Sequence, residues 1–196
     1  MAHTDINIWQ SFLSGDKFSF EELMKTYYEV LFNYGSKYAG DKELIKDCIQ
    51  ELFIGLWTRR HNLSQDVNPK AYLIASFRRS LHRKIQSEKK ILQAGEMPGN
   101  FEFELSIEER IIYNENDKLL AYKLKELIET LPERQKEVIY LKFFVGLNRD
   151  EIAEIMGNKP QTVSNLLQMA FKTLRIELKD ISVVKIALMI TAFCFK

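Results

Sequence analysis

The sequence is poor in the residues that build metal centres and disulfide frameworks. Its 196 residues include only two cysteines, Cys48 and Cys194, which lie far apart and outside any CxxC or Cys/His cluster. The three histidines, His3, His61 and His82, also lack the spacing of metal ligands. There is neither a glycine-rich phosphate loop nor a nucleophile beside an evident base. The sequence therefore predicts a protein that is not an enzyme, with no small-molecule substrate and no cofactor or metal.

Long apolar runs are equally scarce. The amino end, MAHTDINIWQSF, lacks the basic start and unbroken apolar stretch of a secretory signal, so we expect a cytoplasmic protein. Near the other end, ISVVKIALMITAFCF is apolar for fifteen residues apart from Ser182, Lys185 and Thr191. That run is shorter than the roughly 20 residues that cross a bilayer, so no stable membrane span is expected. Residues 181–196 should form an apolar tail that packs on the preceding domain, with a partner-docking surface or a weak membrane contact as the alternative.

The net charge of +1 argues against a protein that coats DNA by bulk electrostatics, although charges of the two signs are separated along the chain. Residues 75–90 contain the single acid Glu88 among many cations, whereas residues 91–120 contain only Arg110 and Lys118 among many acids. The cations of the first segment are Arg78, Arg79, Arg83, Lys84, Lys89 and Lys90. The acids of the second are Glu96, Glu102, Glu104, Glu108, Glu109, Glu115 and Asp117. A basic helix is thus expected to lead into an acidic connector.

Apolar residues recur almost everywhere with the 3.6-residue period of a helix, and no segment alternates convincingly like a strand. We therefore predict an all-α fold with two small helical domains. The first, residues 1–90, should be a three-helix lobe, and the second, residues 117–180, should contain four helices. Residues 91–116 include two glycines and a proline without helical periodicity, which predicts a flexible acidic linker.

The most informative segment is LNRDEIAEIMGNKPQTVSNLLQMAFKTLR, residues 147–175, which predicts two short helices around a tight turn. Asn148 can cap the first helix with Glu151 as its reciprocal partner. Gly157 can end that helix in a left-handed conformation, and Pro160 suits the first position of the next. Apolar residues should bury one side of the second helix: Val163, Leu166, Leu167, Ala170 and Leu174.

The other side of this second helix presents amides, hydroxyls and one cation. These residues are Gln161, Thr162, Ser164, Asn165, Gln168 and Lys172. Such a row can hydrogen-bond base edges and phosphates when a helix enters a major groove. The segment therefore favours a DNA-binding helix-turn-helix, with an ordinary helical hairpin and a solvated polar face as the alternative.

Two further surfaces are candidates for binding. On the helix expected at residues 41–60, a narrow stripe beside large apolar residues consists of Asp47, Gln50, Glu51 and Ile54. It suits docking onto a basic partner helix, although a solvated face is the simpler explanation. Cations on the next helix and its preceding loop include Arg59, Arg60, His61, Arg79 and Arg83, with His82 on the same face. Because Tyr72 and Phe77 add aromatic rings nearby, this surface suits single-stranded DNA.

Three segments closely resemble the two conserved domains of extracytoplasmic-function sigma factors, which are RNA polymerase subunits. The chain contains DxxQExFxxLW from Asp47, LPxRQxEVxxLxFxxGL from Leu131 and EIAEIMG from Glu151, in the family's order and at its spacing. The resemblance covers most of residues 18–90 and 117–177. FRRSLHRK looks most like the variety common among the Bacteroidetes.

The resemblance implies a subunit that binds core RNA polymerase and directs promoter recognition and melting. The stripe from Asp47 to Ile54 would meet the clamp helices of the largest polymerase subunit. Arg59, Arg60 and His61, together with Arg78, Arg79 and Arg83, would engage the minus-ten element. The polar side of the last helix would contact the minus-thirty-five element as duplex, and an anti-sigma factor would be a further partner.

This chain departs from its relatives on the last helix, where many of them have Lys or Arg. It has instead Ser164, Leu166, Met169 and Phe171, with Lys159 in place of a serine cap. We therefore expect relaxed or unusual sequence preference. Two alternatives to an active sigma factor stay open at this point: a dimeric helix-turn-helix regulator, and a degenerate sigma factor that titrates polymerase or an anti-sigma factor.

Overall fold

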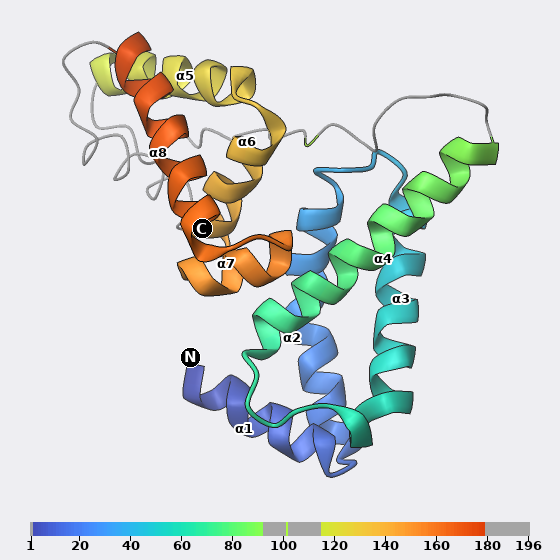
Figure 1. Cartoon of the computed structure of the whole chain (residues 1–196). Coiled ribbons are helices and arrows are strands. Elements are labelled where there is room, and N and C mark those ends of the chain that lie inside the picture. Colours follow the sequence, from blue (N-terminus) through green and yellow to red (C-terminus); the bar gives the residue numbers. More distant parts are fainter. Residues whose placement is uncertain (1, 92–100, 102–114, 179–196) are drawn as a thin grey trace. The chain divides into compact units, whose positions relative to one another are not determined.

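The computed structural model describes residues 2–91, 101 and 115–178 (Figure 1). Within these ranges every regular element is helical, which confirms the all-α prediction. The chain divides into two compact units, residues 1–100 and residues 101–196. None of the described helices is both long and apolar enough to cross a membrane. The apolar tail at residues 181–196 and most of the expected linker lie outside the described residues.

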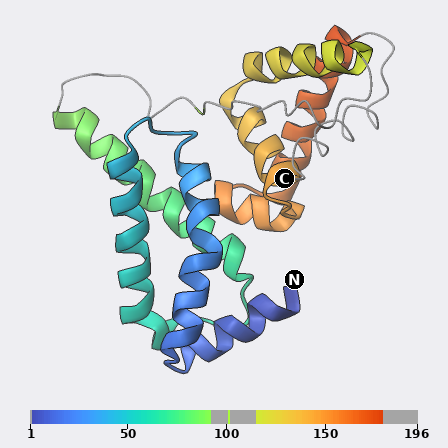
Figure 2. The same cartoon turned by 180° about the vertical axis from the view of Figure 1, so that it is seen from behind.

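In the first unit, residues 2–91 form four α-helices that pack around one apolar interior. They are α1 (Ala2–Leu13), α2 (Lys17–Gly35), α3 (Lys42–Arg59) and α4 (Pro69–Ile91), with a 3-10 turn η1 (Arg60–Asn62) after α3. Helices α2, α3 and α4 are the three that the sequence predicts, and each contacts the other two. Helix α1 is an addition to the predicted three-helix lobe, and it packs across the lower end of α2 and against α4 (Figure 2).

Short polar side chains fix where the helices of this unit begin. Asp16 accepts hydrogen bonds from the backbone N–H of Ser19 at 2.9 Å and from its hydroxyl at 2.6 Å. Asp41 accepts from the backbone N–H of Glu43 at 2.9 Å, and Asn68 accepts from that of Lys70 at 3.0 Å. Each cap satisfies N–H groups that have no partner within the helix. The local sequence therefore sets the starts of α2, α3 and α4.

Gly35 lies where α2 meets α3 and α4. A Cβ atom at this position would stand 2.9 Å from Ile45 Cγ2 and 2.9 Å from Phe77 Cζ. Both neighbouring side chains are fully buried, so neither can move into solvent. The absence of a side chain at Gly35 is therefore what lets the three helices approach this closely.

The described part of the second unit consists of a helical hairpin and a helix-turn-helix. Its elements are α5 (Glu115–Thr130), α6 (Glu133–Ile139), a π-helical turn η3 (Tyr140–Phe144), α7 (Arg149–Met156) and α8 (Pro160–Glu177). Helix α8 contacts α5, α6 and α7, so it forms the centre of the unit. The ring of Phe101 is buried in this unit, with its centroid 5.9 Å from that of Tyr140.

Candidate nucleic-acid interface

Hydrogen bonds on both sides of the turn fix how α8 leaves α7. Asn148 Oδ1 accepts from the backbone N–H of Glu151 at 3.0 Å, and Glu151 Oε2 accepts from the N–H of Asn148 at 2.7 Å. Gly157 adopts a φ of +63°, and the N–H of Asn158 donates to the carbonyl of Ala153 at 2.8 Å. These contacts confirm the predicted capping box and the predicted glycine stop. Pro160 is the first residue of α8, also as predicted.

The polar side of α8 is largely exposed to solvent. Four of the six predicted DNA-contacting residues are exposed: Gln161, Asn165, Gln168 and Lys172. The other two, Thr162 and Ser164, are half-buried and flank this row. On the opposite side Val163, Ala170 and Leu174 are fully buried. Leu166 and Leu167 are only half-buried, so the apolar side is narrower than the sequence predicts.

Two of the exposed amides are joined. Gln161 Nε2 donates to Asn165 Oδ1 at 3.0 Å, one helical turn apart. The Ser164 hydroxyl donates back to the carbonyl of Pro160 at 3.3 Å, so this hydroxyl is engaged with its own helix. Met169 is 56% exposed among these polar residues. The face therefore offers a paired amide and a methionine at its centre, with a single cation, Lys172, toward its end.

The stripe on α3 lies beside an apolar groove. Asp47, Gln50, Glu51 and Ile54 are all exposed, as predicted, and Ile54 is 58% exposed. The groove between α2 and α3 has a cavity volume of about 440 Å³. Its lining is Phe20, Met24, Tyr28, Ile49, Gln50, Phe53, Ile54, Trp57 and Thr58, together with Lys46, whose charge is paired with Glu43. This surface can bind a helix that has apolar side chains along one side and basic side chains along another.

Glu51 already has a partner within the unit. Lys84 Nζ on α4 donates to Glu51 Oε1 at 2.8 Å. That hydrogen bond raises the pKa of the Lys84 ammonium group, and burial opposes the shift. The carboxylate of Glu51 is thus held in place on the surface of α3 by a contact that the sequence did not predict.

The end of α3 presents cations beside an aromatic ring. The guanidinium carbon of Arg60 lies 4.4 Å from the centroid of the Trp57 ring, and its Nη1 donates to the Trp57 carbonyl at 2.8 Å. Arg59 and His61 are exposed, and Arg59 Nε donates to the Gly55 carbonyl at 3.2 Å. Arg60 is therefore preorganised by stacking, while its neighbours point to solvent.

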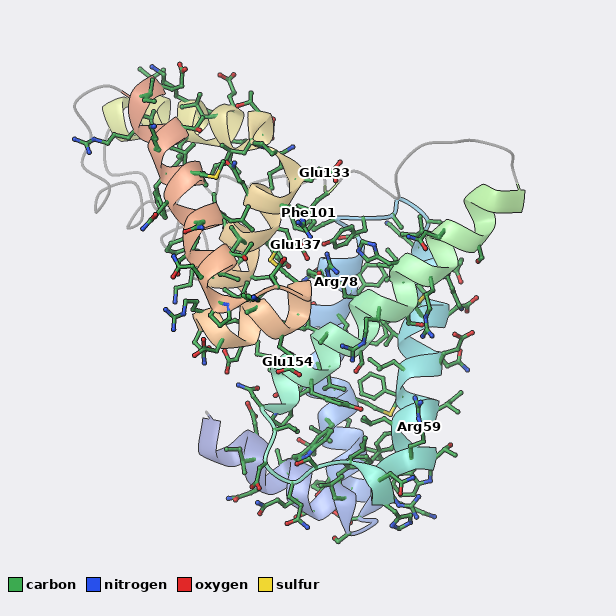
Figure 3. All side chains as sticks on the ribbon, in the orientation of Figure 1. Arg59, Arg78, Phe101, Glu133, Glu137 and Glu154 are labelled. Atoms are coloured by element: carbon green, nitrogen blue, oxygen red, sulfur yellow. The ribbon has the colours of Figure 1, made fainter. Side chains whose placement is uncertain are left out.

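The cations of α4 form a second group. Arg79 and Arg83 are exposed one turn apart on the outer side of α4, and Arg78 is half-buried at its flank. Figure 3 shows Arg59 at the end of α3 and Arg78 on α4, at separate places in the unit. Lys84, next to Arg83, pairs with Glu51 on α3. Glu51 precedes Arg59 by eight residues, which is about 12 Å along the helix. The six predicted minus-ten residues therefore form two groups and not one cluster.

Two other expectations for this surface are wrong. The His82 ring packs in a T-shaped arrangement on Tyr38, with centroids 4.8 Å apart, and so does not lie on the outer face. Phe77 is fully buried and contacts Tyr34, which removes it as a ring for stacking a base. Tyr72 is half-buried against Trp9. By helical period His82 falls between the two faces of α4, and Phe77 falls on the inner face. Contacts with neighbouring helices then determine where each side chain lies.

Helix α1 contains a residue that sequence reasoning missed. Trp9 is fully buried, and its indole Nε1 donates to the carbonyl of Ser64 at 3.0 Å. Ser64 belongs to the loop between η1 and α4, which follows the cations at the end of α3. Trp9 also contacts Phe12, whose ring lies 6.3 Å from that of Trp57. The spacing of Trp9, Phe12 and Leu13 at i, i+3 and i+4 was the available signal.

Both units match models of known protein families. Residues 23–91 match sigma-70 region 2, and residues 122–174 match sigma-70 region 4. The chain belongs to the sigma-70 family. With region 2 followed by region 4, it is a sigma factor of the extracytoplasmic-function type, as the sequence motifs predicted. Proteins of this family are not enzymes, in agreement with the prediction made from the sequence.

The curated relatives match this sigma factor over part of its length. The RNA polymerase sigma factor SigV of Bacillus subtilis (strain 168) is 46% identical over 55 residues, which are 28% of this chain and 33% of SigV. The RNA polymerase sigma factor SigF of Mycobacterium tuberculosis is 39% identical over 56 residues, or 29% of this chain and 22% of SigF. The matches thus span a third or less of these relatives. They give no support to the resemblance to the Bacteroidetes variety.

Solved structures share the fold across most of the chain. CnrH, solved in complex with the cytosolic domain of CnrY, has a TM-score of 0.59 at 17% identity and covers 91% of this chain and 99% of its own. The sigma factor RpoE from Bartonella quintana, solved with the anti-sigma factor NepR, has a TM-score of 0.57 at 17% identity and covers 83% and 98%. At this identity the likeness concerns the fold.

Proposed function

We propose that this sigma factor joins core RNA polymerase in the cytoplasm and directs promoter recognition and melting. The observation that carries the proposal is that regions 2 and 4 occur in one chain, each with exposed residues suited to binding. In this proposal residues 1–90 act as region 2 and residues 117–180 as region 4. Residues 91–116 serve as an acidic linker and residues 181–196 as an apolar tail. The polymerase performs the chemistry, and this subunit lowers the free energy needed to open the DNA.

Core polymerase would bind at the stripe on α3 and the adjoining groove. Ile54, at 58% exposure, and Met24, at 39%, place apolar surface on either side of the groove. Asp47 and Glu51 add negative charge along α3, which suits a basic partner helix. The pairing of Glu51 with Lys84 holds one of these carboxylates in a defined position before the partner arrives.

Ile54→Ser tests this docking surface. Loss of one buried isoleucine should weaken binding to core polymerase by about tenfold or more, since such a side chain contributes roughly 1.5–3 kcal/mol. Ile6→Ser is the matched control, because Ile6 is a 37% exposed isoleucine of the same unit on α1, away from the groove. Affinity can be measured by fluorescence anisotropy of labelled full-length chain titrated with core enzyme. Equal effects of the two substitutions would contradict the assignment.

Promoter DNA would be bound in two forms. Region 2 would bind the minus-ten element as a single strand through Arg59, Arg60, His61, Arg78, Arg79 and Arg83. The stacked Arg60–Trp57 pair supports this role, because cations next to aromatic rings suit phosphates next to unstacked bases. Region 4 would bind the minus-thirty-five element as duplex through Gln161, Thr162, Ser164, Asn165, Gln168 and Lys172. An anti-sigma factor is a further proposed partner, since the similar RpoE structure contains one.

Run-off transcription with core enzyme and a randomised promoter library tests the whole proposal. We expect transcripts that depend on the added chain and that start downstream of a shared pair of elements. Binding to core enzyme without any transcript would indicate a degenerate sigma factor. Homodimers on a palindromic site, with no binding to core enzyme, would instead indicate a dimeric helix-turn-helix regulator.

A further inference from the structure

The outer face of α8 contains an apolar residue whose exposure the fold does not require. Met169 is 56% exposed, and between Pro160 and Lys172, all described, it is the one large apolar residue in the exposed class. It lies four residues after Asn165 and three before Lys172, so it shares their side of the helix. The buried side of α8 is formed by other residues, including fully buried Ala170. The side chain of Met169 therefore does not contribute to the buried interior of the unit.

The paired amides beside it have a defined set of remaining hydrogen-bonding groups. Because Gln161 Nε2 donates to Asn165 Oδ1 at 3.0 Å, Gln161 Oε1 remains as an acceptor and Asn165 Nδ2 as a donor. In the major groove adenine presents N7 as an acceptor and its N6 amino group as a donor. The joined pair is thus complementary to an adenine edge, and its own hydrogen bond limits side-chain freedom before DNA binds.

Met169 continues the same stripe one turn beyond Asn165. Thymine differs from the other bases in the major groove by its C5-methyl group, which an apolar side chain can contact. The thioether chain of methionine is flexible and polarisable, so it can follow the position of that methyl group. The commonest bidentate contact to guanine comes from Arg or Lys, and in this row only Lys172 has a positive charge. The face is therefore suited to A·T base pairs.

We propose that Met169 determines sequence specificity by packing against the C5-methyl group of a thymine in the minus-thirty-five element. This thymine lies beside the base pair whose adenine the Gln161–Asn165 pair contacts. The inference rests on the proposed function. It specifies the base that α8 selects and the chemical group by which α8 recognises that base.

The first experiment compares base preference. Full-length chain and core RNA polymerase are incubated with duplex promoter fragments randomised over the minus-thirty-five element, and bound fragments are sequenced. The wild-type chain should enrich thymine at one position, and Met169→Ala should lose that enrichment and keep the adenine beside it. Ile176→Ala is the matched control, because Ile176 is 61% exposed on the same side of α8 but about 10 Å further along the helix. It should leave the preference unchanged.

The second experiment removes the methyl group from the DNA. Deoxyuridine in place of the enriched thymine keeps the base pair and its O4 acceptor, and takes away only the C5-methyl group. Wild-type holoenzyme should bind this fragment about fourfold more weakly, the equivalent of one methyl group no longer buried. For Met169→Ala the two fragments should bind equally, and Met169→Leu should restore most of the difference. A change in the folding of α8 would not produce this dependence on a single DNA methyl group.

The outcomes separate this inference from the proposed function. If the holoenzyme selects a minus-thirty-five element and Met169→Ala changes no position in it, the inference is wrong and the sigma function stands. Equal sensitivity of wild type and Met169→Ala to deoxyuridine would also overturn it, as would selection of no duplex sequence at all. Failure of the chain to join core polymerase would overturn the function and this inference with it.

Discussion

A single hydrogen bond from Trp9 connects α1 to the loop that follows the cations of α3. Its indole donates to the Ser64 carbonyl at 3.0 Å across 55 positions in sequence. Trp9→Phe keeps an aromatic side chain in the interior but leaves that carbonyl without its donor. We expect unfolding to become easier by about 1–3 kcal/mol, and faster amide exchange in residues 62–67. Urea denaturation and hydrogen-exchange mass spectrometry would measure these effects, and unchanged exchange in the loop would contradict this role of α1.

Asp16 makes the start of α2 sensitive to acid. Hydrogen bonds from the Ser19 hydroxyl and backbone lower the pKa of this carboxyl below its usual value of 3.8. Because the folded pKa is the lower one, the cap stabilises the fold fully above about pH 4 and loses this effect as the pH falls through the folded pKa. Asp16→Asn can still cap but does not titrate. Its urea midpoint should fall less than that of wild type between pH 6 and pH 3.

Ser19→Ala is the control for the acid sensitivity of Asp16. It removes the largest contribution to the lowered pKa but keeps the carboxyl group. The acid-induced loss of stability should then be smaller than in wild type, and larger than in Asp16→Asn. Identical pH profiles for all three proteins would mean that the cap has no part in acid unfolding.

At the scale of elements, the meeting of α2, α3 and α4 depends on Gly35. Gly35→Ala would force its Cβ atom to within 2.9 Å of buried Ile45 and Phe77. Overpacking of this kind costs about 1–3 kcal/mol, more than the helix propensity gained by alanine. The matched control is Gly40→Ala, where a Cβ atom would meet nothing within 4 Å. Thermal unfolding should therefore show a lower midpoint for the first variant only, and equal midpoints would show that the contact relaxes freely.

Helices whose ends are determined by nearby residues could be predicted from the sequence. The Asn148 cap, the Gly157 stop and Pro160 at the start of α8 all act within a few residues of where they occur, and the structure confirms them. The π-helical turn Tyr140–Phe144 has no such local signal, so it could not be predicted from the sequence. Helix α1 was missed because its main signal is a short run of apolar residues whose burial depends on α2 and α4.

In the candidate site, too, some features follow from local sequence and others depend on how the helices pack. Exposure of the α8 face and of the α3 stripe follows from helical period alone, because one side of each helix must be buried. The separation of the predicted minus-ten residues into two groups depends on how α3 crosses α4, as does the Glu51–Lys84 ion pair. Contacts between residues that are distant in sequence carry no periodic signal, so these features needed the structure.

For the whole molecule, a net charge of +1 limits how tightly the chain alone can hold DNA. At the region 4 face the exposed cations on or directly before α8 are Lys159, Lys172 and Arg175. Each neutralised phosphate contributes about −0.9 to the slope of log K against log salt, so duplex binding through this face alone should have a slope no steeper than about −3. Fluorescence anisotropy titrations at salt concentrations between about 50 and 200 mM would measure this slope.

Core polymerase should change this behaviour without adding cations to α8. When the polymerase holds regions 2 and 4 on one promoter, binding at one element raises the effective concentration of the other, which can increase overall affinity by about 10²–10⁴. We therefore expect weak, salt-sensitive binding by the lone chain and much tighter binding by the holoenzyme on the same fragment. Tight, salt-resistant binding by the isolated chain would contradict this account, because it would require contacts beyond the three cations on and directly before α8.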